Sequence, residues 1–138
     1  MVLICRQPFY RQLAAGADVE ARKEAAERLA EGMASDRVDN LPILRGLLGD
    51  SDMSVRAAAT VSLLLLGEKD VEKQIVTWLK SPDLGERNAT LYQLLRVADG
   101  RSLIFARDAL RALSTQVQDR QFEKQRVQQL LERIAGAE

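Results

Sequence analysis

Three acid–base pairs stand out as residues that could do chemistry, because in each the aspartate precedes an arginine by four positions. They are Asp18 and Arg22, Asp52 and Arg56, and Asp83 and Arg87. In a helix this spacing places acid and base on one face, where they could serve acid–base catalysis or hold a phosphate. The pairs recur at intervals that match the recurrence of whole segments of the chain, so the interpretation we favour is structural.

The remaining reactive residue types are scarce. The sequence contains no His and a single Cys, Cys5, so the chain alone offers no disulfide, no Cys–His nucleophile and no zinc site of the usual ligands. We find no glycine-rich phosphate loop and no nucleophile elbow. We therefore expect a protein that is not an enzyme and that uses no cofactor or metal. Trp78 continues an apolar helical stripe and is expected to lie in the core rather than to serve as a stacking platform.

The composition limits the remaining functions. The 138 residues are expected to form one domain, residues 1–138, and their 20 basic and 20 acidic residues cancel. No long-range field therefore favours nucleic acid or acidic lipid as a partner. The opening segment MVLICRQPFY lacks the length of a signal peptide, which predicts a cytoplasmic protein, or a periplasmic one if the sequence is a fragment of a secreted enzyme.

Turn signals divide the chain into segments of helical period, and none alternates as a strand does. We expect an all-α fold of eight helices, at residues 5–15, 18–33, 40–49, 52–66, 70–80, 82–97, 103–114 and 119–135. The helix at 52–66 is apolar nearly all round and is expected to be the central one. Its predicted ends are the acidic cap at Asp50–Asp52 and Gly67. Further predicted caps are Asn40 ahead of Pro42, Ser81 ahead of Pro82, and Ser102.

The long helices repeat one another. Arg22, Arg56, Arg87 and Lys124 occupy equivalent positions, 34, 31 and 37 residues apart, and each long helix follows a shorter apolar one. The pattern predicts four helix pairs, at residues 1–34, 35–67, 68–99 and 100–138. Stacked pairs bury a continuous core that no single pair can form alone.

The segment Leu47–Gly67, LLGDSDMSVRAAATVSLLLLG, resembles a HEAT repeat of the short kind found in phycobilisome lyases. Leu47–Leu113 is also similar to the HEAT-like region that follows the catalytic domain of some bacterial sulfatases. The third repeat departs from the pattern, with Glu86 where Val is usual and Gln93 where a small residue is usual. The resemblance implies a right-handed α-α superhelix, a HEAT or armadillo-like solenoid, in which the Asp and Arg residues link consecutive repeats.

In such a solenoid the second helix of each pair lines the concave side. Projection at 100° per residue turns six residues of the two central repeats away from the core. One is Ala57, and the five larger ones are Val61, Leu64, Asn88, Tyr92 and Leu95. We expect them to bind a partner protein or a second copy of the chain, unless the chain curls and hides them. The predicted function is thus a non-catalytic protein–protein interaction or scaffold module.

Two rival functions are an accessory or docking domain of a larger enzyme, of the sulfatase-associated type, and a HEAT-like DNA glycosylase. The glycosylase needs a basic groove, whereas Lys23 is the one basic residue at the projected outward positions of the long helices. We therefore expect no nucleic acid, no membrane and no small-molecule substrate among the partners.

Overall fold

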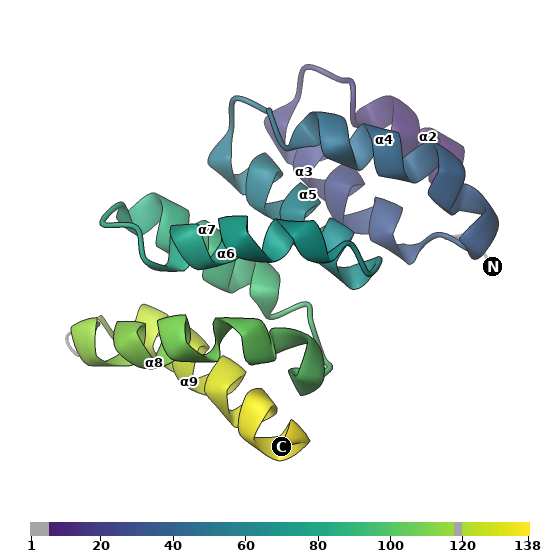
Figure 1. Ribbon diagram of the computed structural model, residues 1–138. Coiled ribbons are helices and arrows are strands. Elements are labelled where there is room, and N and C mark those ends of the chain that lie inside the picture. Colours follow the sequence, from purple (N-terminus) through teal and green to yellow (C-terminus); the bar gives the residue numbers. More distant parts are fainter. Residues whose placement is uncertain (1–5, 118–119) are drawn as a thin grey trace. The chain divides into compact units, whose positions relative to one another are not determined.

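A computed structural model describes residues 6–117 and 120–138, and all regular elements in these ranges are helical (Figure 1). They comprise eight α-helices and four short 3-10 segments. The prediction of an all-α fold with eight helices is confirmed. Within these ranges, no helix combines the length and the apolar character needed to cross a membrane. The chain divides into two compact units, unit 1 (Met1–Lys69) and unit 2 (Asp70–Glu138), and each is described by itself.

Unit 1 contains two helix pairs. Its elements are α2 (Gln7–Leu13), α3 (Val19–Arg28), η1 (Leu29–Glu31), η2 (Ala34–Asp36), α4 (Arg37–Leu47) and α5 (Met53–Leu65). Helix α2 packs on α3, α4 packs on α5, and α3 also packs against α5. The predicted central helix, α5, therefore contacts elements of both pairs within the unit. Leu63, which lies near its C-terminal end, is fully buried.

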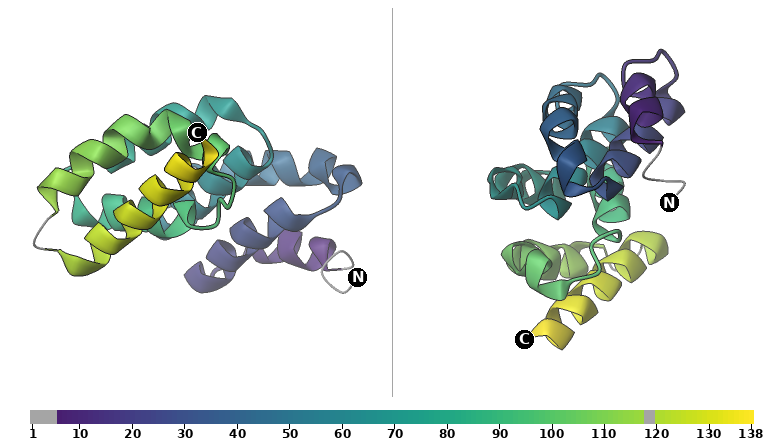
Figure 2. Two further views of the ribbon diagram at one scale, coloured as in Figure 1. Left: turned by 90° about the horizontal axis from the view of Figure 1, so that it is seen from below. Right: turned by 90° about the vertical axis from the view of Figure 1, so that its right-hand side faces the viewer.

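Unit 2 repeats this arrangement. Its elements are α6 (Glu72–Leu79), α7 (Leu84–Leu94), η4 (Gly100–Ala106), α8 (Arg107–Gln116) and α9 (Gln121–Ala137), preceded by η3 (Lys69–Val71) at the boundary of the two units. Helix α6 packs on α7 and α8 packs on α9, and the second helices α7 and α9 also contact each other. Figure 2 shows α9, in yellow, running beside the green α8. Trp78 of α6 is buried, so its predicted place in the core is confirmed.

Aspartates begin the second helices of three pairs. The carboxylates of Asp18, Asp52 and Asp83 each accept a hydrogen bond from the backbone N–H two residues on, at 3.2, 2.9 and 2.7 Å. This satisfies an N–H group that the helix itself leaves unpaired. At the other end of α5, Gly67 has a φ of 89°, a left-handed conformation that closes a helix and favours glycine. The predicted ends of the central helix are thus confirmed.

Three other predicted caps are wrong. Asn40 lies inside α4, which begins at Arg37, and its buried amide donates to the side-chain oxygen of Gln7 and the carbonyl of Leu29. Ser81 precedes the true cap of α7, and its hydroxyl accepts the N–H of Asp83. Ser102 lies within η4, which Asp99 caps by accepting the N–H of Arg101.

Candidate functional site

Two of the three recurrent arginines, Arg22 and Arg87, bind carboxylates, and neither binds the one four residues before it. Arg22 donates two hydrogen bonds to the carboxylate of Asp50, from Nε at 2.8 Å and from Nη2 at 3.1 Å. Arg56 donates to the backbone carbonyl of the same Asp50 at 2.7 Å. Asp50 therefore joins α3 to the start of α5, and in doing so links the two helix pairs of unit 1.

Arg87 makes the corresponding link in unit 2. Its Nε donates to Oε1 of Glu123 at 2.7 Å, and its Nη1 donates to the carbonyl of Ser81 at 2.9 Å. The side chains of this ion pair are only 8% and 2% exposed. Because these charges are engaged inside the fold, the interpretation of the recurrent pairs as structural stands. No cluster of three possible metal ligands occurs in the part of the chain that the structure describes.

The Arg22–Asp50 contact makes stability sensitive to acid. The guanidinium of Arg22 holds the pKa of Asp50 below its ordinary value, chiefly by donating hydrogen bonds to the carboxylate. The pKa of Asp52 is also lowered, first by the hydroxyl of Ser54. A lowered pKa stabilises the folded state above the unfolded value of about 3.9, and this stabilisation is lost as the pH falls through the folded value.

We therefore expect the free energy of unfolding to fall as the pH drops from about 5 to 3. Asp50→Asn should be less stable than the native chain at pH 7, and the difference should shrink over this window. Urea unfolding followed by circular dichroism at several pH values measures both effects. Asp39→Asn, at an exposed position of α4, controls for the loss of one charge. A difference between native chain and Asp50→Asn that stays constant with pH would contradict the expectation.

Two of the five predicted partner-binding residues are not available on the surface. Val61 and Leu64 are 1% and 8% exposed, so the expectation that they form an accessible strip is wrong. The reason is the packing of α5, in which every residue from Val55 to Leu64 except Arg56 is buried. A helix buried on all sides leaves no apolar face for a partner. Serine at position 64 should accordingly cost stability rather than binding.

The other three predicted residues belong to one stripe of α7. Leu84, Asn88, Tyr92 and Leu95 follow one another at intervals of four, four and three residues, the spacing of a single helix face. Tyr92 is 49% exposed and Leu84 is 43% exposed. Asn88 and Leu95 are half-buried. Three of the four side chains are apolar or aromatic, so this helix face is mainly apolar and partly open to solvent.

A second stripe on α9 lies beside the first. The guanidinium of Arg126 sits 5.8 Å from the centre of the Tyr92 ring, within the range of a cation–π contact. Phe122, one turn before Arg126 on the same helix, is 78% exposed. We call the surface formed by Leu84, Asn88, Tyr92, Leu95, Phe122 and Arg126 the α7–α9 face.

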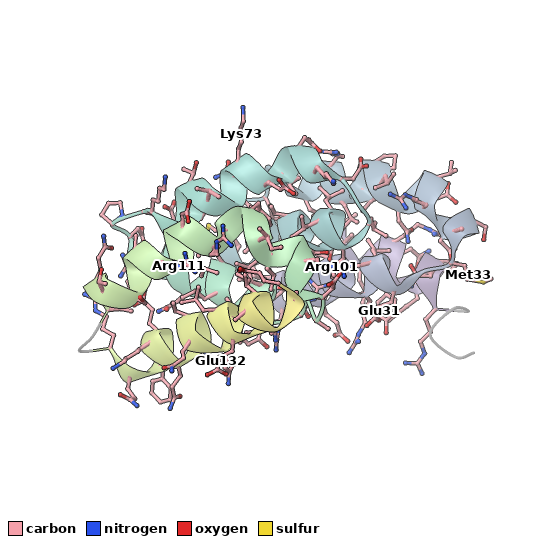
Figure 3. All side chains as sticks on the ribbon, turned by 60° about the horizontal axis from the view of Figure 1, so that its bottom comes forward. Glu31, Met33, Lys73, Arg101, Arg111 and Glu132 are labelled. Atoms are coloured by element: carbon pink, nitrogen blue, oxygen red, sulfur yellow. The ribbon has the colours of Figure 1, made fainter. Side chains whose placement is uncertain are left out.

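The α7–α9 face is bordered by Arg133 at one end. Its Nη1 donates to the carbonyls of Leu95 and Val97 at 2.8 and 3.0 Å, which satisfies carbonyl groups at the end of α7. Glu132, labelled in Figure 3, instead lines a separate hollow of about 450 Å³ with Ser114 and Lys124. Glu132 and Lys124 therefore belong to a different surface from Arg133.

Leu84 and Phe122 were missed by the sequence prediction. Leu84 could have been identified from its spacing, because it lies eleven residues before Leu95 and so shares its helix face. Phe122 lies in the last of the four predicted repeats, outside the two central repeats to which the predicted strip is confined.

No model of a known protein family, no curated protein and no solved structure matches the chain. The function proposed for it is therefore argued from the fold and the α7–α9 face.

Proposed function

We propose that the chain is a non-catalytic protein-binding module and that the α7–α9 face of unit 2 contacts the partner. The observation that carries this proposal is that two exposed aromatic side chains, Tyr92 and Phe122, lie on neighbouring helices, and that Arg126, one turn after Phe122, contacts the Tyr92 ring. Large aromatic residues and arginines supply most of the energy in protein interfaces. A mainly apolar stripe beside such residues is a surface that gains free energy when a partner covers it.

The packing supports a module of the helical-repeat class. In each unit two helix pairs pack through their second helices, α3 on α5 and α7 on α9. Stacking of this kind is what a right-handed HEAT-like solenoid requires, and the side-chain links made by Arg22 and Arg87 fall between successive pairs. Solenoids commonly present the second helices of their repeats to a partner. The α7–α9 face is formed by two such helices.

The role proposed for the recurrent carboxylates is architectural. Asp18, Asp52 and Asp83 cap helices, and Asp50 and Glu123 hold arginines. A carboxylate committed to backbone N–H groups or to a guanidinium is poorly placed to exchange protons with a substrate. This use of the acidic residues supports a binding module rather than a hydrolase.

The proposal is tested by replacing Tyr92 and Phe122 together with serine. We expect stability to change by no more than about 1 kcal/mol, the worth of an exposed cation–π contact. Association with the partner should be lost, because the two anchors are removed. Melting curves give the stability. Quantitative pull-down from the host gives the partner, and sedimentation of the purified chain detects binding to a second copy.

Val38→Ser is the matched control, because Val38 is an exposed apolar residue of α4 in unit 1 at 79% exposure. It should retain the same bound protein as the native chain. The proposal fails if the double variant retains that protein at native levels, or if its melting temperature falls steeply while association is unaffected.

A further inference from the structure

We infer that the α7–α9 face takes an acidic segment of a partner protein, one that also carries large apolar side chains. This inference rests on the proposed function and adds the chemistry of the partner to it. It is supported by the charges around the two stripes, by the length of the face and by the charge balance of the whole chain.

Arg126 is the first feature of the face that favours an acidic partner. Its guanidinium contacts the ring of Tyr92, and among the described residues no carboxylate lies within ion-pair distance of it. Other arginines of the chain are paired differently: Arg22, Arg45 and Arg87 each hold a carboxylate at less than 3 Å. A cation fixed beside an exposed aromatic ring, and free of an internal counter-ion in the described chain, is placed to receive an acidic group from outside.

The charges near Arg126 have the same sign or are already engaged. Arg133, seven residues beyond Arg126, donates to backbone carbonyls, so its positive charge is not cancelled there by a carboxylate. Glu86 accepts a hydrogen bond from Ser81, and Glu123 is buried against Arg87. The stripe on α7 carries no charged residue. The α7–α9 face therefore combines apolar groups with a positive edge.

The length of the α7 stripe also suits a short segment of a partner. From Leu84 to Leu95 the stripe covers eleven residue steps, which corresponds to about 16 Å at the helical rise. About five extended residues, or three turns of a helix, cover that length. A short segment of a partner can thus place an apolar side chain against Tyr92 and Leu95 and a carboxylate beside Arg126 at the same time.

Charge balance favours protein over nucleic acid as the acidic partner. Exposed aromatic rings beside arginines also suit the bases of a single strand, but affinity for nucleic acid grows with the number of phosphates neutralised. The chain has 20 acidic and 20 basic residues, and the edge of the face contributes two arginines. An acidic protein segment needs only one or two such contacts, because its apolar side chains supply the rest of the binding free energy.

The experiment selects binders from a phage-displayed library of random 12-residue peptides on the native chain and on three variants. Clones are kept if they bind the native chain and do not bind the Tyr92→Ser variant. Among these we expect enrichment of Asp and Glu together with Leu, Phe or Trp. Arg126→Gln should lower the affinity for synthetic acidic peptides about two- to fivefold, the range for an exposed ion pair. It should not change the affinity for control peptides in which each Asp and Glu is replaced by Gln. Lys124→Gln, on the same helix but in the separate hollow, should change the affinity for neither set of peptides.

The outcomes separate this inference from the proposed function. Clones that depend on Tyr92 without acidic enrichment would overturn the acidic partner and leave the protein-binding proposal standing. If no selected clone depends on Tyr92, the inference is overturned. The pull-down with the Tyr92 and Phe122 double serine variant then tests the proposed function independently. Salt-dependent binding of a labelled random 20-nucleotide single strand, lost in Arg126→Gln and tighter than that of the selected peptides, would also overturn it in favour of nucleic acid.

Discussion

Replacement of Glu123 by alanine is expected to lower the free energy of unfolding by about 3–5 kcal/mol. Glu123 and Arg87 are almost fully buried, and their atoms Oε1 and Nε lie 2.7 Å apart. Removing the acid strands a guanidinium in a poorly hydrated site, where an unpaired charge is far more costly than the pair itself. Urea unfolding of the native chain and the variant measures the loss.

Two further variants show whether the loss comes from the stranded charge. Glu132→Ala, at an exposed position of the same helix, should change stability by no more than about 0.5 kcal/mol. The double variant Arg87→Met and Glu123→Leu should recover most of the loss, since apolar groups of similar volume replace both charges. The interpretation fails if Glu123→Ala costs less than about 1 kcal/mol, or if the double variant is less stable than either single one.

Replacement of Gly100 by alanine is the second change with a large expected effect. Gly100 begins η4 where that segment packs against α9. A Cβ atom at this position would overlap the backbone carbonyl of Arg133 and lie 3.0 Å from Cβ of Ala137. Because the obstacle is backbone within a helix, it cannot turn aside as a flexible side chain would. We expect a loss of at least about 3 kcal/mol, measured by thermal and urea unfolding.

Gly136→Ala is the matched control, since a Cβ at Gly136 of α9 meets nothing within 4 Å. It should be neutral or stabilising by up to about 1 kcal/mol, because alanine favours a helix more than glycine does. Equal stability of the Gly100 and Gly136 variants would show that η4 does not approach α9 as closely as described.

The helices could be predicted because their signals are local. The apolar period, the aspartate at position 52 and the glycine at position 67 act over one or two turns, and the structure places the ends of α5 there. Where two capping residues compete, the local signal is ambiguous. Ser81 and Asp83 both favour caps, and the sequence alone does not reveal that the carboxylate binds the helix while the hydroxyl binds the N–H of Asp83 itself.

The surface was harder to predict, because exposure depends on what packs against each helix face. Helical projection places Val61 and Tyr92 at matching outward positions, yet Val61 is buried and Tyr92 is half exposed. The partners of the arginines could not be predicted either, because Arg22 and Arg87 bind acids 28 and 36 residues further along the chain. Repeat spacing indicated that these positions are equivalent, but it carries no information on which carboxylate each one holds.

The short sequence span of these links has a consequence for how the chain folds. Even the long-range bond from Arg133 to the end of α7 joins residues only 38 positions apart, and within each unit every helix packs on a partner in its own pair or in the adjacent one. Chains dominated by such near-neighbour contacts close small loops and reach the native state in microseconds to milliseconds. During synthesis, the contacts within unit 1 can therefore form as soon as α5 has emerged, without waiting for the rest of the chain.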